Sequence, residues 1–272
     1  MLHQFSYVAP KSREELLDLL STDYAHAKIL AGGTDLLVNI RNGTVKPGMV
    51  IDIKKIKEFS GITYSKGEGL VLRPAVTIND VLRDPTVRDY FPLLQECGHD
   101  LASYQIRNRA TVIGNVVNAS PCSDMAPALL CLDSQVVLAS SRGTRTVPLK
   151  EFFIGVKKTV LAPDEIVERI IVPTQAKGAI GKYRKLKRIN GHDLGIIGVA
   201  VAVVNGHVRI AVSSAAPTPV VTEGLPMDIQ VDEAVEITMN MISPISDVRC
   251  TKEYREFMVN TFVRRLLAEV RG

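Results

Sequence analysis

Two stretches of this chain carry groups that could bind an anion, and the first is AGGTD at residues 31–35. Glycine loses more conformational freedom on folding than any other residue, so the Gly32-Gly33 pair marks a place where side chains would be in the way. The pair follows a short apolar run and precedes a helix-like pattern, TDLLVNIRNG. It predicts either a tight turn that binds nothing, or bare backbone N–H groups at a helix start that face an anion, most often a phosphate.

The second stretch, RNRATVIGNVVNASPCSDMAP at 107–127, is crowded with small and polar residues and shows weak periodicity. Long irregular segments are uncommon inside compact domains and are usually functional. One interpretation is a surface connection. The other is a binding loop, because hydrogen-bonding groups are dense here: Gly114, Asn115, Asn118, Ser120 and Asp124.

A dinucleotide, with its pyrophosphate and flat polar ring, would need two such loops. Backbone N–H groups would hold the phosphates, and small residues would let the ring approach. Thr34 offers a hydroxyl to such a ligand. Asp35 offers either a carboxylate to the ligand or an N-cap to the helix that follows, and the sequence leaves both open.

Familiar catalytic templates are absent from the sequence: it has no G-x-S-x-G, H-E-x-x-H, P-loop or G-x-G-x-x-G after a strand. The histidines are scattered; we expect His207 at the surface, and His99 and His192 are the two that could line a site. Cys97, Cys122, Cys131 and Cys250 form no C-x-x-C pair, which argues against a structural zinc or an iron–sulfur cluster in this chain. Any chemistry is therefore expected to come from a bound cofactor.

Composition points to a globular protein with one large domain or two ordinary ones: 272 residues, 46% hydrophobic and 23% charged. The net charge of +4 is mild, and the basic run GKYRKLKR alternates like a strand, so we expect no nucleic-acid partner. The opening residues lack a signal-peptide pattern, and the free thiols then favour the cytoplasm. LGIIGVAVAVV is too short to span a bilayer, so no membrane span is expected.

Capping and periodicity predict the elements that position the two loops. Ser12 and Glu15 form a capping box before a helix that starts near residue 13. Strands and helices then alternate up to PTQAKGAIG at 173–181, which describes an α+β unit and a domain boundary. Among the helices, one is capped by Thr77 and Asp80, and another is predicted over TVRDYFPLLQECGHDLAS. Beyond it, Asn205-Gly206 between two apolar runs predicts a hairpin. A last helix, capped by Thr251, is expected to bury a stripe made of Tyr254, Met258, Phe262 and Leu266.

Three motifs, in this order along the chain, resemble the flavin-binding medium subunit of the molybdenum hydroxylases of the xanthine dehydrogenase and carbon monoxide dehydrogenase type: AGGTDLL, QIRNRATVIGNVVNASPCSDMAPALLCLD and YRKLKRINGHDLGIIGVAVA. The resemblance covers nearly the whole chain. It implies an α+β fold in which a PCMH-type FAD-binding domain at 1–175, with subdomains at about 1–55 and 56–175, precedes a C-terminal antiparallel sheet-and-helix domain at 176–272.

The resemblance implies an FAD held by two clamps and their neighbours. Because no His or Cys lies at an obvious attachment point in either glycine loop, we expect the FAD to be bound non-covalently. The first clamp would wrap the pyrophosphate and comprises Ile29, Leu30, Ala31, Gly32, Gly33, Thr34, Asp35 and Leu36. The second comprises Thr111, Gly114 and Asn115, with Ser120 and Asp124 near the ribose, phosphate or ring edge, and Ala102 nearby. Lys185 matches a basic position of the third motif and either faces the flavin or is a surface lysine of a strand.

The chain departs from the family pattern at Ile113, where relatives usually carry a glycine. A β-branched residue at positive φ costs about 1–3 kcal/mol. We therefore predict that Ile113 lies at negative φ with its side chain packed inward, and that Gly114 takes any positive φ.

The function implied by the resemblance is that of an FAD-carrying electron-transfer subunit. It would take electrons from the iron–sulfur clusters of a small partner subunit, in a complex with a molybdenum-cofactor large subunit, and pass them to NAD or another acceptor. One alternative is a stand-alone flavin oxidoreductase, against which stands the lack of an acid–base residue. Another is a partner-binding module that has lost its flavin, against which stands the intact AGGTD loop.

Overall fold

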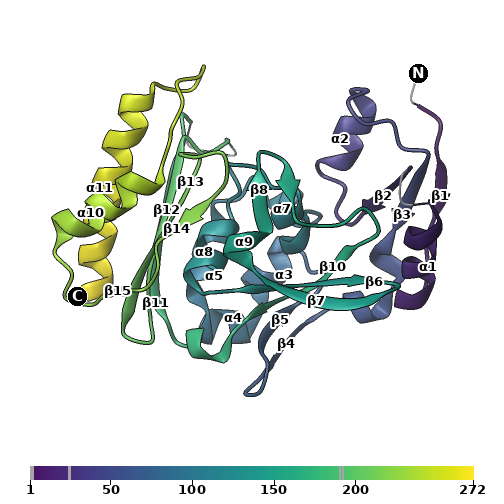
Figure 1. Ribbon diagram of the computed structural model, residues 1–272, viewed down its shortest axis with the longest axis horizontal. Coiled ribbons are helices and arrows are strands. Elements are labelled where there is room, and N and C mark those ends of the chain that lie inside the picture. The colour runs from purple at the N-terminus through teal and green to yellow at the C-terminus, as the bar shows by residue number, and fades with distance from the viewer. Residues whose placement is uncertain (1–2, 24–25, 190, 192) are drawn as a thin grey trace.

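A computed structural model describes residues 3–23, 26–189, 191 and 193–272, which form successive regions that are each built on their own sheet (Figure 1). The first region pairs β1 (Ser6–Val8), β3 (Met49–Asp52) and β2 (Ala27–Leu30) in parallel, in the order β1-β3-β2. Helices α1 (Arg13–Asp23) and α2 (Leu36–Arg41) connect the strands. Because the strands are parallel, their carboxyl ends meet at one edge of the sheet, and the AGGTD loop leaves β2 at that edge.

The capping signal predicted for α1 is confirmed. The N–H of Glu15 donates to Ser12 Oγ over 3.2 Å, and the Glu15 carboxylate accepts from the N–H of Lys11 over 2.7 Å. The carboxylate thus reaches one residue further back than in a standard capping box. These bonds direct one face of α1 onto the sheet, where its leucines are buried: Leu16, Leu17 and Leu20.

The second region is a five-stranded antiparallel sheet in the order β4-β5-β10-β6-β7, covered by short helices. Its strands are β4 (Ile62–Ser65), β5 (Gly69–Leu72), β6 (Gln135–Ser140), β7 (Gly143–Pro148) and β10 (Ile166–Val172), with a small hairpin of β8 (Phe153–Gly155) and β9 (Lys158–Thr159). Its helices are η1 (Ile53–Lys55), η2 (Lys57–Phe59), α3 (Ile78–Arg83), α4 (Pro85–Tyr90), α5 (Pro92–His99), α6 (Tyr104–Arg107), α7 (Val112–Val117), α8 (Ala126–Cys131) and α9 (Leu149–Phe152).

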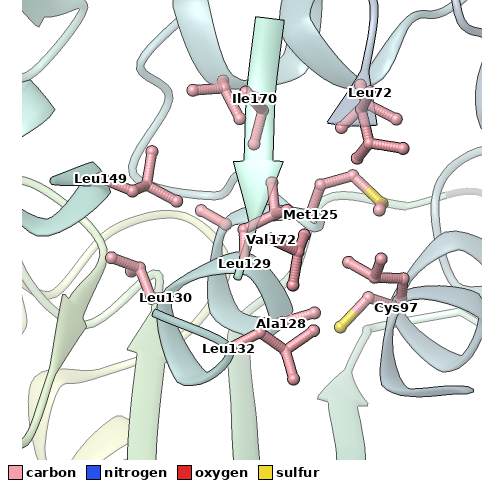
Figure 2. Close-up of a cluster of buried hydrophobic side chains, with 14 of the residues drawn as sticks. Leu72, Cys97, Met125, Ala128, Leu129, Leu130, Leu132, Leu149, Ile170 and Val172 are labelled. Carbon is pink, nitrogen blue, oxygen red and sulfur yellow. The ribbon is translucent and has the colours of Figure 1, made fainter. Parts of the chain in front are cut away.

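The largest core of the molecule lies between this sheet and its helices. Figure 2 shows Leu72 and Val172 from the strands meeting Cys97 of α5 and Leu129 of α8. Burial raises the pKa of the Cys97 thiol well above its usual value, so this cysteine is a core residue.

Two expectations about this region need correction. The pattern TVRDYFPLLQECGHDLAS predicts one helix, but α4 ends at Tyr90 and α5 begins at Pro92, because proline cannot donate the hydrogen bond that would continue α4. The stretch at 107–127 is also less irregular than its weak periodicity indicates, since it contains α7 and the start of α8.

The third region follows η3 (Thr174–Ala176) and is an antiparallel sheet with two helices on one face (Figure 1). Its elements are β11 (Ile180–Leu186), β12 (Ile197–Val204), β13 (His207–Ser213), β14 (Val220–Val221), β15 (Leu225–Pro226), α10 (Val231–Met241) and α11 (Lys252–Arg271). The predicted hairpin is confirmed: Val204 pairs with His207, and Asn205 and Gly206 both have positive φ, as a type I′ turn requires.

The β11–β12–β13 sheet contributes to two cores. Ala200 and Ala202 face the core of the second region, while Val199 and Val201 pack against α10 and α11. The Thr251 cap of α11 is confirmed. The predicted stripe is wrong at its start, because Tyr254 is exposed and the buried face of α11 is instead Arg255, Val259, Phe262, Val263, Leu266, Leu267 and Val270.

None of the helices in the described residues has the length and apolar character needed to cross a membrane.

Candidate functional site

The AGGTD loop presents a run of free backbone donors at the end of β2. In the described residues, the N–H groups of residues 32–36 donate to no other group of the protein. Gly33 lies at φ +77, a conformation that a residue with a side chain rarely adopts. Free N–H groups in a glycine turn are the arrangement that holds an anion such as a phosphate.

Gly32 lacks a side chain for a reason that the sequence did not indicate. A Cβ at this position would overlap the carbonyl oxygen of Arg109 and lie 3.1 Å from Cα of Ala110. The protein's own backbone therefore occupies the space beside Gly32. The contact brings the first loop against the segment that leads into the second one.

Asp35 occupies the N-cap position of α2, as one alternative predicted, but its backbone is helical and its side chain makes no capping bond. Its carboxylate instead accepts a hydrogen bond of 3.1 Å from the side-chain amide of Asn118. The other end of that amide accepts from the Lys157 ammonium over 2.8 Å. Asp35 therefore links the first loop to the end of α7 and to the β8–β9 hairpin.

The second loop begins as a capped helix. Thr111 is the N-cap of α7, and its hydroxyl accepts from the N–H of Gly114 over 3.0 Å. A Cβ on Gly114 would lie 2.7 Å from that hydroxyl oxygen, which explains the glycine. Neither Gly114 nor Ile113 is among the residues with positive φ. Ile113 is buried in the core, so the prediction that it lies at negative φ with its side chain packed inward is confirmed. Gly114 does not adopt a positive φ either.

The polar side chains of the second loop shape the loop itself. The Asn115 side-chain oxygen accepts from the Ser123 hydroxyl over 2.6 Å and from the N–H of Met125 over 3.2 Å. The Ser120 hydroxyl accepts from the N–H of Cys122 over 3.3 Å. Each of these groups is thus committed to the turn that ends at α8.

Asp124 and Lys185 form a buried ion pair, so the surface-lysine alternative is wrong. The ammonium lies 2.8 Å from Asp124 Oδ1 and also donates to the carbonyl of Asp100 over 3.1 Å, with only 2% of the Lys185 side chain exposed. Burial raises the pKa of Asp124, and the positive charge of Lys185 opposes this rise. Tyr183, two residues earlier on β11, has its pKa raised by burial and by the Asp124 carboxylate.

Ala102, two residues after Asp100, lies in a strained turn with φ +42. The Arg107 guanidinium holds the turn by donating to the carbonyl of Ala102 over 3.2 Å and to that of Leu101 over 2.9 Å.

Of the two histidines that could line a site, only His99 falls within the described residues. His99 and His207 are exposed, and His192 lies outside the described residues. The described residues also contain no group of histidine, cysteine and carboxylate side chains that could hold a metal ion.

Sequence reasoning missed two sets of contacts. Lys54 donates to the carbonyl of Ala31 over 3.2 Å and pairs with Asp52. From the third region, Arg249 donates to Cys122 Sγ over 3.3 Å, and the N–H of Ser214 donates to the carbonyl of Pro121 over 2.7 Å. Apart from Asp52 and Lys54, which are two residues apart, these partners lie far apart in the chain, and no local spacing marks the contacts between them.

The fold is of the α+β type, and its first loop presents the free backbone N–H groups that could bind an anion such as a phosphate. Comparison with known proteins makes this specific. Residues 3–175 match the family described as "FAD binding domain in molybdopterin dehydrogenase", and residues 181–270 match "CO dehydrogenase flavoprotein C-terminal domain". The chain belongs to this family of FAD-binding medium subunits of the molybdenum hydroxylases, and its cofactor is FAD.

Relatives align over nearly their full length. The carbon monoxide dehydrogenase medium chain of Hydrogenophaga pseudoflava is 33% identical over 97% of this chain and 96% of its own. A putative xanthine dehydrogenase FAD-binding subunit of Escherichia coli strain K12 is 31% identical over 97% of this chain and 95% of its own. The solved structure of the Hydrogenophaga carbon monoxide dehydrogenase lacking the Mo-pyranopterin moiety superposes with a TM-score of 0.92 at 32% identity, over 98% of this chain and 97% of that one.

Quinoline 2-oxidoreductase from Pseudomonas putida 86 shares the fold, with a TM-score of 0.90 at 24% identity over 100% of this chain and 98% of that one. These matches confirm the expected oxidoreductase flavoprotein and the α+β FAD-binding architecture followed by a sheet-and-helix region.

Proposed function

We propose that the first loop holds the diphosphate of FAD through the N–H groups of residues 32–36. The observation that carries this proposal is that these donors have no partner in the described part of the chain. Ile29, Leu30 and Ala31 lead into the loop, and Thr34 adds a hydroxyl. Gly33 leaves the loop without a side chain on the turn. The residues present therefore fit a bound FAD.

In the same proposal, the second loop forms the opposite wall of the cofactor site. Thr111, Gly114 and Asn115 set the backbone of this wall, and Ser120 and Asp124 extend it toward Lys185. Ala102 lies in the turn between Asp100, which binds Lys185, and Arg107. The direct Gly32–Arg109 contact supports the idea that both loops face one ligand.

We propose further that this subunit works in a complex with an iron–sulfur small subunit and a molybdenum-cofactor large subunit. It would accept electrons from the iron–sulfur clusters and pass them to NAD or another acceptor. Bound FAD supplies the redox chemistry. The names of the relatives, a medium chain and an FAD-binding subunit, support this assignment, since each describes part of a larger enzyme.

Two further parts of the assignment are proposals. We place the division between the FAD-binding domain and the C-terminal domain near residue 175, where η3 precedes β11. We also propose that the protein works in the cytoplasm, because Cys97, Cys122, Cys131 and Cys250 are all free thiols.

Co-expression with the two partner subunits tests the complex. We expect the three chains to co-migrate on gel filtration and the flavin to be reduced when the organic substrate is added, with NAD then reoxidising it. The chain alone should bind FAD but show only slow, unselective reduction by artificial donors. Robust turnover of an organic substrate by the isolated chain would instead support a stand-alone oxidoreductase.

A further inference from the structure

A lysine outside both loops contacts the start of the first loop. Lys54 lies in η1, directly after β3, and the register of the parallel sheet pairs Asp52 with Leu30. This register places the end of β3 beside the start of the AGGTD loop. The Lys54 ammonium reaches across and donates to the carbonyl of Ala31 over 3.2 Å.

Lys54 is itself held in place by Asp52. The ammonium lies 2.7 Å from Asp52 Oδ1, which also accepts the backbone N–H of Lys54 over 3.0 Å. The other oxygen of Asp52 accepts from the Tyr7 hydroxyl over 2.8 Å. Burial alone would raise the pKa of Asp52, but the hydrogen bonds from Lys54 and Tyr7 lower it below its usual value. The carboxylate therefore stays charged opposite the lysine.

The position of this ammonium matters because the loop itself carries no positive charge. A diphosphate brought to residues 32–36 would approach two carboxylates, Asp35 in the loop and Asp52 beneath it. It would also face the negative end of the Ala31 carbonyl unless that oxygen is bound elsewhere. A lysine ammonium has three N–H donors, of which Asp52 and Ala31 take two.

We propose that Lys54 is a positioning residue for the cofactor diphosphate: it turns the Ala31 carbonyl away from the ligand and compensates the negative charge of Asp35 and Asp52. The inference rests on the proposed role of the first loop. Tyr7 and Asp52 act through Lys54, so β1, β3 and η1 together fix where the loop begins.

The test compares Lys54→Met with Lys55→Met in the full chain after removal of bound FAD. Both variants keep the aliphatic stem and lose one positive charge from the same exposed turn, but of the two lysines it is Lys54 that contacts the Ala31 carbonyl. FAD affinity is measured by quenching of flavin fluorescence at low and at high salt. We expect Lys54→Met to raise the dissociation constant about tenfold at low salt, as expected for the loss of one charge-assisted hydrogen bond.

Salt dependence separates this role from a merely structural one. Salt screens the attraction between Lys54 and the diphosphate, so the wild-type affinity should fall with salt, and the affinity of Lys54→Met should fall less. Lys54→Arg keeps the charge and should keep the wild-type salt response. Lys55→Met should change the affinity less than about twofold.

Equal FAD affinity and equal salt response in Lys54→Met and Lys55→Met would overturn the inference while leaving the proposed site intact. A wild-type chain that binds no FAD would overturn both the proposed function and the inference. A lower affinity in Lys54→Met with an unchanged salt response would show a structural role only and would also overturn the inference.

Discussion

The first loop approaches the segment that leads into the second loop where Gly32 meets the backbone of Arg109, but different interactions hold each loop. The first loop has glycines, free N–H groups and few bonds of its own. In the second, the side chains of Thr111, Asn115 and Ser120 are each bonded to a nearby group of the same loop. The backbone donors of the first loop therefore have no partner among the described residues, whereas the polar side chains of the second loop stabilise that loop itself.

Because the two loops are held differently, substitutions in them should affect protein stability and FAD binding to different extents. Changes in the second loop remove packing or buried bonds, and so they should lower the stability of the protein with or without FAD. Changes in the first loop leave most of the core intact and should release FAD at a smaller cost in stability. Stability of the FAD-free protein and FAD content can therefore be measured separately.

The largest loss of stability is expected for Ile113→Gly in the second loop. Ile113 is buried in α7, so the variant loses side-chain packing and places a glycine inside a helix. Together these effects should cost about 4 kcal/mol of unfolding free energy. FAD should still bind at a temperature where the variant is folded, because the donors of the first loop are unchanged.

Val117→Gly is the matched control in the same helix, since Val117 is partly exposed and loses little burial. Urea unfolding of the FAD-free variants measures the difference. A gain in stability from Ile113→Gly would mean that the isoleucine is strained and that packing of its side chain does not stabilise the second loop.

The next largest loss is expected for Lys185→Met, which leaves Asp124 as an uncompensated buried carboxylate. Removing one partner of a buried ion pair costs about 3 kcal/mol or more. Lys182→Met, on the same strand but in an exposed pair with Glu96, should cost far less. Adding Asp124→Asn to Lys185→Met should recover part of the loss. If Lys185→Met is no worse than Lys182→Met, the Asp124–Lys185 pair does not support the second loop.

Local signals predicted much of the fold. Ser12 with Glu15, Thr77 with Asp80, and Asn205-Gly206 each fix an element through residues a few positions apart, and all are found in the structure. Helix α7 was not predicted. Its N-cap, Thr111, is followed three positions later by Gly114 and not by an acidic residue, so the sequence contains no capping box there.

The candidate site was predictable in its loops but not in its contacts. The glycine pair indicated the loop at 31–35, and the density of small and polar residues indicated the stretch at 107–127. The overlap that excludes a side chain at Gly32, the Asp35–Asn118 bond and the Lys54–Ala31 bond depend on how separate elements pack. Such packing follows from the assembled core and leaves no mark on neighbouring positions.

In the first loop, Gly32→Ala should have a smaller effect on stability but should remove FAD. One added methyl group would overlap the Arg109 carbonyl, so the loop must shift away from it. We expect about 2 kcal/mol of lost stability, typical of overpacking, but no FAD in the purified protein. Gly67→Ala is the control, because a Cβ there meets nothing within 4 Å. A Gly32→Ala protein that retains FAD at wild-type content would remove the first loop from the site.

The smallest effect is expected at Asp247, which supports the second loop from a distance through Arg249 and its contact to Cys122. Asp247 accepts hydrogen bonds from Arg249 and from the fully buried Arg255, and these hold its pKa below the usual value of 3.8. A carboxylate with a lowered pKa stabilises the fold above its unfolded pKa, and that contribution disappears as the pH falls through its folded pKa. Asp247→Asn should therefore cost about 1.5 kcal/mol near neutral pH, and the difference from wild type should shrink only as the pH drops below 3.8.

Asp89→Asn provides the control for this acid dependence, since Asp89 also has a lowered pKa but pairs with Arg88 in an exposed position. Its substitution should leave stability unchanged within error, because solvent screens the pair. Thermal unfolding between pH 3 and 7 distinguishes the two cases. A pH-independent difference between wild type and Asp247→Asn would mean that packing, not charge, links the C-terminal helix to the second loop. That loop would then depend on uncharged contacts such as the Ser214–Pro121 bond for its connection to the third region.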